Sequence, residues 1–584
     1  MKIIKLKIKN FRAIGSEGIS IDLENNNLVF LIGKNNAGKS SILFAYEMFV
    51  IAKKKATESD FFHKKLSNNI EIEVWIKAEN DSDSIEIDRL KLSKRFNQEK
   101  IAKIKKIWST VTSEGKQKSW NVDENSWEDK NLGGFDTFLQ STCPTPIWIK
   151  GLASSEEVIK LLQELVKATI ISKIKDTDAY TKAEIAVKAL QKEIEKNDYV
   201  CQIENQLNDA MSQIFSDISC NLINSGEHDF IKTLGTQTNV EINQTDKPNL
   251  GLDYHGHGTR RQFILSAFRQ FATPLTEIQK TKAQRKGENL SIISETSHLK
   301  SKMLLFEEPE LFLHPEAIFS VIEILYSLAE KSEFQMMVAT HAPVIIDLSK
   351  SHTTLIRVVN HSNNGTCVFQ PPNTLFNKDE RNRMIMLNRF NPHVCEAFFA
   401  DRVILVEGDT ETIAVRTILE RFKEEQVLKQ LEHIHVVNCG SITNIPLFQK
   451  ALNHFKITYY VLHDIDSKKN KDGTKNSAWK INDEIWAEIE KAENEEVRRF
   501  VFTLNFEDAH NYKPKEKLGK PFSAYQEVSK WDINDTSKPI IKYLRVIFKK
   551  EKLEQKFSPD ELEKLHNEKY PEKDNNLSKQ SELF

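Results

Sequence analysis

Hydrophobic and polar residues alternate in parts of the N-terminal third of the chain. Lysine alternates with leucine and isoleucine from Lys5 to Ile8, and glutamate alternates with isoleucine and valine from Ile70 to Val74. Successive side chains of a strand point to opposite faces, so this alternation predicts strands with one buried face. Short runs that are apolar almost throughout instead predict strands buried on both faces, as in a parallel sheet. These runs lie at residues 28–32, 303–306, 335–339, 403–406 and 459–462.

A block from residue 151 to about 245 has helical spacing instead. Ser154 and Glu157 match a capping box, and apolar residues then recur three and four positions apart. We expect a helical insertion that packs on itself or on a second copy of the chain, and an ordinary helical subdomain without a role in assembly fits the pattern equally well. Helices are also expected after Pro315 and over residues 410–422.

These changes of pattern divide the chain into segments of an α/β protein. The segments are residues 1–150, 151–250, 251–395, 396–570 and 571–584, the last being a polar tail.

Composition narrows the possible classes of function. The chain has 584 residues, of which 39% are hydrophobic and 28% charged, which is sufficient for several packed cores. No run approaches the roughly 18 apolar residues of a membrane span, and the N-terminus lacks the features of a secretory leader. The six cysteines form no CxxC pair, which indicates a reducing, cytoplasmic environment. The net charge is −2, so any nucleic-acid surface must come from local patches.

A phosphate-binding loop is predicted at residues 33–40. The sequence GKNNAGKS matches the pattern GxxxxGK followed by Ser or Thr, between an apolar run and a helical segment. Glycines let backbone N–H groups surround phosphate oxygens at a helix N-terminus, while Lys39 bridges the terminal phosphates and Ser40 ligates Mg²⁺. A simple glycine-rich turn is the alternative. The expected nucleotide contacts are Gly33, Asn35, Asn36, Ala37, Gly38, Lys39, Ser40 and Ser41.

Two acids follow the apolar run at 303–306. Glu307 is expected to hold Mg²⁺, directly or through water, and Glu308 to orient or deprotonate the attacking water. Paired acids often simply end a strand, but the sequence PELFLHP that follows favours the functional role. His341, after the next apolar run, is expected to contact a γ-phosphate, although a single histidine is more often structural.

These features together resemble the SMC-like branch of ABC ATPases, with the Asn-Phe-Arg sequence that ends at Arg12 as a further match. The resemblance implies an ATPase head whose two lobes flank a helical insertion, with Arg12 near the nucleotide. It also implies a signature loop that reaches the ATP of a second subunit, and hence a homodimer or larger oligomer. The sequence HGHGTRRQ at 255–262 is the best match, although it lacks the usual Ser-Gly-Gly core. Its candidate nucleotide contacts are Gly256, Gly258 and Arg260.

A second acidic set follows the last two apolar runs. Glu407 ends the first run and Glu411 lies four residues later, while Asp464 and Asp466 follow the second run. Strand ends of a parallel sheet meet at one edge, so the four carboxylates are expected to converge and to bind divalent cations. Two such ions would suit in-line phosphodiester cleavage. Either half alone is more often a solvated turn.

Glu-Gly after one strand and Asp-x-Asp after another resemble the Toprim fold. An ATPase head followed by a C-terminal Toprim domain resembles the OLD (overcoming lysogenization defect) family of nucleases, with Gabija A-subunit-like and retron-associated relatives. The resemblance implies that Glu407, Glu411, Asp464 and Asp466 are catalytic metal ligands. It implies a further acid, Glu507 or Asp508, and a lysine near the scissile phosphate, for which Lys520 is the closest match and an ordinary surface lysine the alternative.

Two basic runs are candidates for DNA contact. Lys468, Lys469, Lys471 and Lys475 follow the acidic run directly, so we expect them to contact DNA phosphates, although charge runs are usually solvated. A second run has no comparable positional argument. It comprises Lys91, Lys94, Arg95, Lys100, Lys103, Lys105 and Lys106.

The expected function is an ATP-binding, metal-dependent DNA endonuclease, active as a homodimer or larger, in which nucleotide state gates cleavage. ATP and Mg²⁺ or Mn²⁺ are the expected cofactors, with one or two ions at the Toprim site. The resemblance implies a role in bacterial antiphage defence, alone or beside a helicase-like protein or a retron reverse transcriptase with its nucleic acid. The main alternative is a non-nucleolytic SMC-like DNA-binding ATPase. A strand-passage or primer-making Toprim enzyme and a transporter ATPase would each need accessory features that we cannot place in this sequence.

Overall fold

The computed structural model describes most of residues 1–149 and 302–569. The gaps in these ranges are residues 25, 52, 80–82, 85–86, 89–91, 130–142, 312, 314, 331–333, 347–352, 362, 373–374, 391, 426–433, 470–473 and 475, and residues 178, 182, 185–186, 241–242 and 250–251 are described in between. The chain divides into two compact units. The second comprises residues 311–328, which are described except for residues 312 and 314, and residues 150–299, nearly all of which lie outside the described residues. The same is true of the expected helical insertion, the tail and the signature loop with Gly256, Gly258 and Arg260. Lys471 and Lys475 are also outside the described part.

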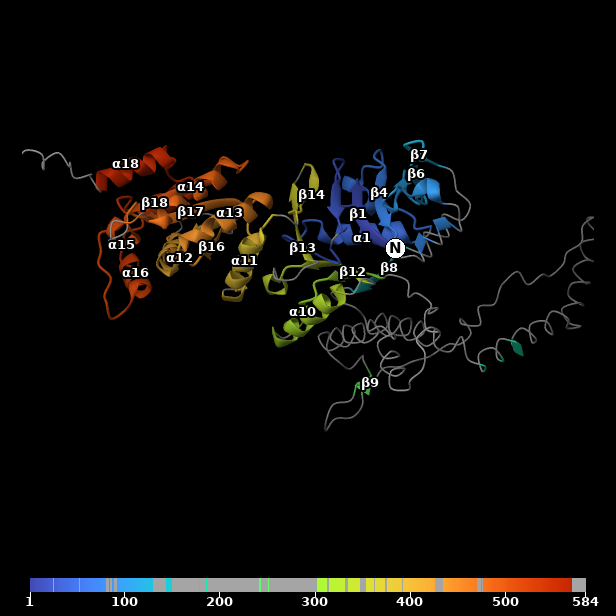
Figure 1. The fold of residues 1–584 in the computed structure, drawn as a ribbon, viewed down its shortest axis with the longest axis horizontal. Coiled ribbons are helices and arrows are strands. Elements are labelled where there is room, and N and C mark those ends of the chain that lie inside the picture. Colours follow the sequence, from blue (N-terminus) through green and yellow to red (C-terminus); the bar gives the residue numbers. More distant parts are fainter. Residues whose placement is uncertain are drawn as a thin grey trace, which may run out of the picture. The chain divides into compact units, whose positions relative to one another are not determined.

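An antiparallel sheet forms the first layer of the N-terminal lobe (Figure 1). Its strands, in spatial order, are β2 (Ile19–Asp22), β1 (Lys2–Lys9), β4 (Ile70–Lys77), β5 (Ile101–Trp108), β6 (Lys116–Asn121) and β7 (Ser126–Glu128). The predicted alternation is confirmed, because the aliphatic residues of β1 and β4 are buried while their lysines and glutamates are partly or fully exposed. One face of this sheet therefore belongs to the core, and the other carries charged side chains.

A second sheet of six strands positions the phosphate loop. Its order is β14 (Gly365–Phe369), β13 (Thr353–His361), β3 (Leu28–Ile32), β12 (Phe334–Thr340), β11 (Lys302–Glu307) and β8 (Thr145–Ile149). All neighbours are parallel except β13 and β14, which pair antiparallel. Helix α1 (Lys39–Val50) starts directly after the loop, and its buried residues share one core with both sheets. The predicted strands at 28–32, 303–306 and 335–339 are confirmed.

A four-stranded parallel sheet forms the C-terminal domain, drawn in orange and red in Figure 1. Its order is β16 (Ile434–Asn438), β15 (Arg402–Val406), β17 (Thr458–Ile465) and β18 (Arg498–Thr503). Helix α12 (Asp409–Glu424) packs against α16 (Lys520–Val528) and α17 (Pro539–Ile547), and α13 (Ile445–His454) packs against α14 (Ser477–Glu490). Both apolar runs predicted to be strands are confirmed, and they are direct neighbours, so their C-terminal ends meet at one edge of the sheet.

Further described helices and short strands lie outside these three sheets. They are α10 (Pro315–Ala329), α11 (Lys378–Phe390), α15 (Phe506–Ala509), α18 (Pro559–Lys569), β9 (Glu241–Ile242), β10 (Leu250–Gly251) and the 3₁₀ helices η1 (Glu58–Asp60), η2 (Phe62–Lys64), η3 (Ser93–Arg95), η6 (Pro343–Ile345), η7 (Pro392–Phe399) and η8 (Ile442–Asn444). Helix α10 confirms the helix expected after Pro315. No described helix is long and apolar enough to cross a membrane.

Candidate nucleotide site and acidic site

The phosphate loop requires glycine at both ends. Gly33 has φ 150°, and a Cβ there would lie 2.1 Å from the carbonyl oxygen of Val358. Gly38 has φ 105°, and a Cβ there would lie 2.1 Å from Thr366 Oγ1. Side chains larger than hydrogen would therefore both strain the backbone and collide with the β13–β14 hairpin. The loop leads directly into the N-terminus of α1, the kind of place where phosphates bind.

The ammonium group of Lys39 is held inside this loop. It donates hydrogen bonds to the carbonyl oxygens of Gly33 and Lys34, at 2.9 and 2.8 Å. Burial lowers the pKa of Lys39 to about 8, and the charges of Glu308, Glu310 and Glu307 oppose this shift. An anion placed in the loop would stabilise the charged form that burial disfavours, so the position suits phosphate oxygens.

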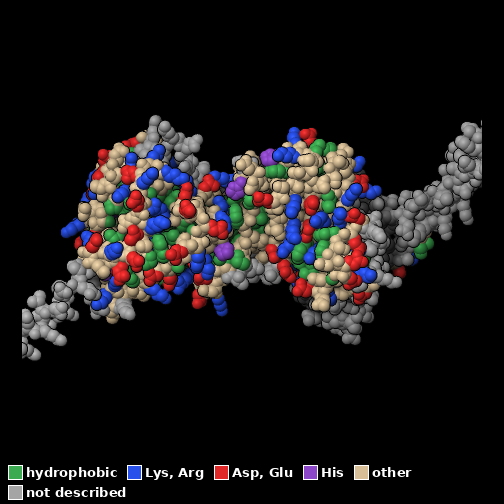
Figure 2. All heavy atoms as spheres, turned by 90° about the horizontal axis from the view of Figure 1, so that it is seen from above, with side chains coloured by type: hydrophobic (Ala, Val, Ile, Leu, Met, Phe, Trp, Pro, Cys, Tyr) green, Lys and Arg blue, Asp and Glu red, His purple; other side chains and the backbone are tan. Residues whose placement is uncertain are grey.

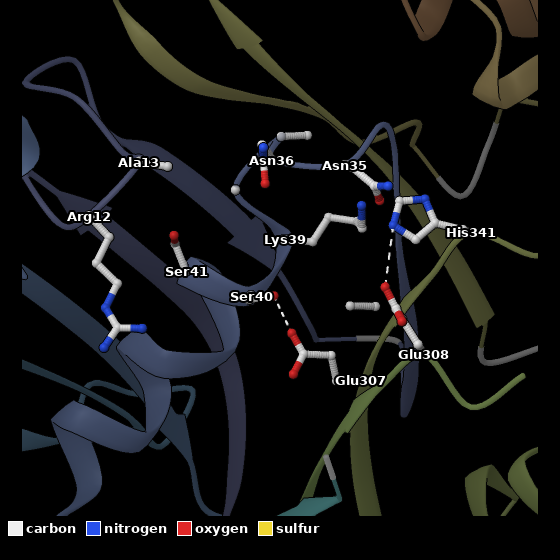
Figure 3. A pocket seen from close by; sticks show the side chains of 13 residues that line it. Arg12, Ala13, Asn35, Asn36, Lys39, Ser40, Ser41, Glu307, Glu308 and His341 are labelled. Carbon is white, nitrogen blue, oxygen red and sulfur yellow. Dashed lines mark hydrogen bonds and ion pairs between the residues drawn. The ribbon is translucent and has the colours of Figure 1, made fainter. Parts of the chain in front are cut away.

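Ser40 and Glu307 contact each other across the site. The Ser40 hydroxyl, in the first turn of α1, donates a hydrogen bond to Glu307 Oε1 at the end of β11 (Figure 3). A hydroxyl and a carboxylate side by side are oxygen ligands of the kind that Mg²⁺ prefers. The two residues predicted to hold Mg²⁺ are thus brought together.

Glu308 and His341 lie at the ends of neighbouring strands. Glu308 adopts a left-handed backbone with φ 47°, and its N–H donates to the Ala339 carbonyl oxygen at 2.7 Å. His341 Nε2 lies 3.7 Å from Glu308 Oε1. Burial and the charge of Lys39 lower the pKa of His341, which favours a neutral imidazole next to the carboxylate. This pair faces Lys39 across the site, as Figure 3 shows.

Glu310 holds the histidine in place, a role that the sequence did not reveal. Its Oε1 accepts hydrogen bonds from the backbone N–H of His341 at 2.8 Å and from the Thr340 hydroxyl at 3.0 Å. Glu307, Glu308 and Glu310, at the end of β11 and just after it, therefore supply three carboxylates with three different contacts.

Lys39, Ser40, Glu307, Glu308 and His341 line one cavity of about 450 Å³, a volume in the range of small-molecule sites. Arg12 also lines it, and its guanidinium pairs with Asp60 at 2.9 Å and lies 3.9 Å from the ring centre of Phe44. The cavity residues are Arg12, Ala13, Asn35, Asn36, Ala37, Gly38, Lys39, Ser40, Ser41, Glu307, Glu308, Ala339 and His341.

The β13–β14 hairpin supports the loop from behind and was not foreseen. Thr366 Oγ1 donates to the Ala37 carbonyl oxygen at 2.9 Å, and Asn360 Nδ2 donates to that of Asn36 at 3.1 Å. Both donors lie more than 320 positions from their partners, and neither belongs to a recognisable pattern. No local signal in the sequence could have identified them.

In the C-terminal domain, Glu407 and Glu411 are joined through the first turn of α12. The Gly408 N–H donates to Glu411 Oε2 at 3.1 Å, which turns this carboxylate back towards the strand end. Glu407 Oε2 in turn accepts from the backbone N–H of Asp464 at 3.4 Å. The ends of β15 and β17 are thus connected by a carboxylate.

The acidic site, defined as Glu407, Glu411, Asp464, Asp466 and Glu507, is electrostatically strained. Burial raises the pKa of Glu407 to about 7 and that of Asp464 to about 9, and the neighbouring carboxylates add to both shifts. Burial also raises the pKa values of Glu411 and Asp466. Asp464 Oδ1 is buried without a hydrogen-bond partner. The site therefore concentrates negative charge that a cation would relieve.

Glu507, not Asp508, faces this cluster. Glu507 is buried at the start of α15, and it contributes to the raised pKa values of both Glu411 and Asp464. Asp508 is exposed and bonded to the side chain of Asn505, which caps the same helix. Lys520 Nζ lies 3.2 Å from Glu507 Oε1 at the N-terminus of α16, so this lysine borders the acidic site.

A divalent ion fits the chemistry of these donors. Five carboxylates, an unpartnered buried oxygen and raised pKa values are features of an oxygen-ligand site for Mg²⁺ or Mn²⁺. Within the described part of the chain, however, no three His, Cys, Asp or Glu side chains are already arranged to hold an ion. Like charges repel, so side-chain rotation is needed to bring the oxygens onto one cation.

Two further features surround the acidic site. Tyr512 has a buried hydroxyl without a hydrogen-bond partner, and burial and the charges of Glu507 and Glu411 raise its pKa. Nothing in the sequence indicated that Tyr512 lies near the acidic site.

In the predicted basic loop, Lys468 pairs with Glu563 and lies 5.3 Å from the Trp479 ring centre, whereas Lys469 is exposed.

The family comparison agrees with this geometry. The model of the AAA ATPase domain family matches residues 1–346, more than half of the chain. The chain belongs to this family. The model of the overcoming lysogenization defect protein-like TOPRIM domain matches residues 398–466, which include β15 and β17 with Glu407, Glu411, Asp464 and Asp466. The predicted α/β fold class and the combination of an ATPase head with an OLD-like Toprim domain are confirmed.

Two relatives of this AAA ATPase-domain protein cover most of its length, and a third covers a shorter part. The Old nuclease of Escherichia phage P2 is 26% identical over 80% of this chain and 78% of its own. Endonuclease GajA of Bacillus cereus strain VD045 is 26% identical over 81% of this chain and 77% of its own. An OLD nuclease of Thermus scotoductus is 30% identical over 28% of this chain and 30% of its own. A solved SMC head bound to the C-winged helix domain of ScpA aligns with 64% of this chain and 99% of its own, at 14% identity and a TM-score of 0.36.

Proposed function

We propose that this protein is an ATP-binding, divalent-metal-dependent DNA endonuclease. The observation that carries the proposal is the meeting of Glu407 and Asp464, with three further carboxylates, at one edge of a parallel sheet. Two relatives named as nucleases, each covering more than three quarters of both chains, support it. The phosphate loop on the same chain supplies the nucleotide site.

In this proposal the acidic site is the cutting site. Glu407, Glu411, Asp464, Asp466 and Glu507 would hold one or two Mg²⁺ or Mn²⁺ ions. Such ions polarise a phosphodiester and supply an activated water for in-line attack. Lys520, which lies 3.2 Å from Glu507, would turn to the scissile phosphate once the carboxylates are engaged elsewhere. Lys469, which is exposed beside the site, would contact the DNA backbone together with Lys468, Lys471 and Lys475.

The nucleotide site would hydrolyse ATP. Lys39 would release the loop carbonyls and bind the terminal phosphates, and Ser40 with Glu307 would hold Mg²⁺. Glu308 would orient the attacking water beside the neutral His341. Residues 255–262 of a second copy would complete the site, so the active form would be a homodimer or larger.

Nucleotide state would gate cleavage through contacts between the sheet that positions the phosphate loop and the sheet of the C-terminal domain. Lys34, inside the phosphate loop, pairs with Asp401, the residue before β15. Arg357 of β13 is buried and donates to the carbonyl oxygens of Phe455 at 2.8 Å and of Ala400 at 3.4 Å. Movement of the loop on ATP binding would therefore shift β15, the strand that Glu407 follows.

Nicking of supercoiled plasmid in Mg²⁺ or Mn²⁺ tests the proposal. We expect cutting by the wild type and a loss of at least about 100-fold in Glu407→Gln and Asp464→Asn, because removing a ligating carboxylate weakens both metal binding and its chemistry. Asp508→Asn, which removes an exposed carboxylate beside the site, is the matched control and should cut normally. Undiminished cutting by both site variants would refute the assignment. ATP turnover with DNA binding but no cutting in any divalent metal would identify a non-nucleolytic ATPase instead.

The biological role that we infer is antiphage defence in bacteria, supported by the similarity to endonuclease GajA. A helicase-like protein, or a retron reverse transcriptase with its nucleic acid, is the kind of partner that would direct the nuclease. Expression in a phage-sensitive host, with and without the neighbouring genes, tests this role. We expect the wild-type protein to protect the host and Glu407→Gln to give no protection. Equal plating of phage on hosts with the wild-type protein and with Glu407→Gln would contradict the defence role.

A further inference from the structure

The outer face of the N-terminal antiparallel sheet carries an ordered array of lysine and tryptophan. Strand pairing places Lys5 of β1 opposite Trp75 of β4, and Trp75 opposite Lys103 of β5. A second row contains Lys7, Glu73 and Lys105, with Lys118 of β6 opposite Lys105. We call this surface the lysine–tryptophan face. It comprises Lys5, Lys7, Trp75, Lys103, Lys105, Lys118, Trp120 and Trp127.

The opposite side of the same strands faces the core. Leu6, Val74 and Ile104, which alternate with the face residues, have no exposed surface and belong to the main core. Since neighbouring residues of a strand point to opposite sides, the lysines and tryptophans have only the outer side available. The register of the sheet therefore determines which side chains lie next to each other in the array.

Trp75 gathers three positive charges around its ring. The ammonium nitrogens of Lys5, Lys7 and Lys103 lie 4.7, 4.9 and 4.4 Å from the ring centre. Lys103 also lies 5.2 Å from the Trp120 ring centre, and Lys105 lies 4.7 Å from that of Trp127. Cation–π contacts offset part of the repulsion among these ammonium groups but do not neutralise their charge. The array therefore keeps its positive charge and can attract an anionic partner.

Lysines outnumber acids on this side of the sheet. The outward lysines of β1, β4, β5 and β6 are Lys2, Lys5, Lys7, Lys9, Lys77, Lys103, Lys105, Lys116 and Lys118, and the outward acids of β2 and β4 are Asp22, Glu71 and Glu73.

The acids neutralise only part of this charge. Glu73 contacts Lys7 at 3.2 Å, and Glu71 contacts Lys105 at 3.3 Å. Further pairs lie at the edges of the sheet: Lys2 with Glu79, Lys77 with Glu24 and Lys118 with Asp129. Among the described residues, no carboxylate lies within ion-pair distance of Lys5 or Lys103, at the centre of the array. Positive and negative side chains are otherwise intermixed over the surface drawn in Figure 2, so this local excess is unlike the chain's net charge of −2.

We propose that the lysine–tryptophan face binds the phosphate backbone of duplex DNA. The inference rests on the proposed nuclease function and adds a second DNA contact, separate from the acidic site. The lysines occupy four neighbouring strands, about 14 Å across at the usual strand spacing, and so offer a broad surface for phosphates. Single-strand binding uses free aromatic rings for base stacking, whereas the Trp75 ring is already covered by lysines. Binding here would be independent of sequence and strongly salt-dependent.

Fluorescence anisotropy of a labelled duplex with the full-length protein tests the proposal. The measurement is made in EDTA, so cleavage is absent, at several salt concentrations. In the double variant Lys5→Gln/Lys103→Gln we expect Kd to rise about tenfold and the slope of log K against log salt to fall by about two, one for each lost phosphate contact. Lys5→Arg/Lys103→Arg keeps both charges and should bind like the wild type. Lys491→Gln/Lys530→Gln removes two exposed lysines elsewhere and serves as the control.

The outcomes separate this inference from the proposed function. An unchanged Kd and salt slope in Lys5→Gln/Lys103→Gln, in a protein that melts like the wild type and still nicks plasmid, would overturn the inference and leave the nuclease intact. Tighter binding of single strands than of duplex, lost in the same variant, would overturn duplex DNA as the occupant. Cutting retained in Glu407→Gln and Asp464→Asn would refute the acidic site as the cutting site without affecting the binding result. In Mg²⁺ we expect the glutamine variant to need more DNA for half-maximal cutting while its maximal rate is unchanged.

Discussion

Glu407 Oε2 accepts a hydrogen bond from the backbone N–H of Asp464 at 3.4 Å, although the two residues are 57 positions apart. They follow adjacent parallel strands, so the sheet itself brings them together. A backbone hydrogen bond stabilises the ionised form of Glu407, but burial and the neighbouring acids have the larger effect on its pKa. The consequences of this arrangement are measurable.

The first prediction concerns stability and pH. Folding raises the pKa of Glu407 to about 7 and that of Asp464 to about 9, from roughly 4 in an unfolded chain. The folded state then holds protons that the unfolded state has released, so stability should fall as the pH rises from about 4 to about 9. Without divalent metal, we expect the Tm to drop by more than about 3 °C over this range, the shift that about 1 kcal/mol produces in a domain of 150–250 residues.

Calorimetry in EDTA measures this slope, and Asp464→Asn should make it shallower because one titrating group is gone. Adding Mg²⁺ should restore the Tm most at high pH, where the carboxylates are ionised. A Tm independent of pH between 5 and 9, and equal in wild type and variant, would contradict the raised pKa values.

The second prediction separates two adjacent acids. Glu507 is buried against the acidic site, whereas Asp508 is exposed and bonded to Asn505. Glu507→Gln should reduce plasmid nicking by at least about tenfold, the usual effect of losing a metal-site partner, and should raise the metal concentration needed. Asp508→Asn should change neither. Equal loss in the two variants would assign the effect to the capping of α15 instead.

The third prediction concerns the fit of the phosphate loop. Gly38→Ala would place a methyl group 2.1 Å from Thr366 Oγ1 at φ 105°, so we expect a destabilisation of about 1–3 kcal/mol and loss of ATP binding. Gly440→Ala is the matched control, since Gly440 has φ 72° but no atom within 4 Å of the added Cβ. It should share the backbone strain and leave ATP affinity unchanged.

Thermal melts and binding of a fluorescent ATP analogue provide the two readouts. If Gly38→Ala bound the analogue like the wild type, the loop would have to be less tightly packed against the β13–β14 hairpin than the distances indicate.

The fourth prediction concerns communication between the nucleotide and acidic sites. Lys34→Ala removes an exposed ion pair with Asp401, and such pairs contribute little to stability, about 0–1 kcal/mol. We therefore expect an almost unchanged Tm and cutting without nucleotide, but a smaller change in cutting rate on adding ATP. Asp401→Asn should behave in the same way. A full nucleotide effect in both variants would exclude this contact from the gate.

Much of the nucleotide site could be predicted because its residues are local. The phosphate loop and the pair Glu307 and Glu308 depend on short sequence patterns next to strands. Thr366 and Asn360 could not be found in this way, since ordinary residues acquire a role only when a distant hairpin packs behind the loop. In the acidic site, the choice between Glu507 and Asp508 needed burial, which adjacent acids do not reveal.

The basic run of the N-terminal lobe also shows the difference between what local sequence reveals and what only the folded structure reveals. As a sequence it is one cluster of positive charge, but the sheet separates its members. Lys103 and Lys105 point outward, whereas Lys106 donates to the Phe49 carbonyl oxygen at 2.6 Å and Arg95 is buried beside Glu128. Strand alternation therefore decides which charges reach a partner, and it could be applied only after the register was known.

The order of strands in the second sheet affects how this protein can change during evolution. β8 ends at Ile149 and its direct neighbour β11 begins at Lys302, so residues 150–301 leave and re-enter the ATPase core between two adjacent strands. The entropy of closing such a connection grows only with the logarithm of its length, about 0.6 kcal/mol for each doubling. Descendants of this chain can therefore lengthen, shorten or exchange the intervening module while the nucleotide site keeps its shape.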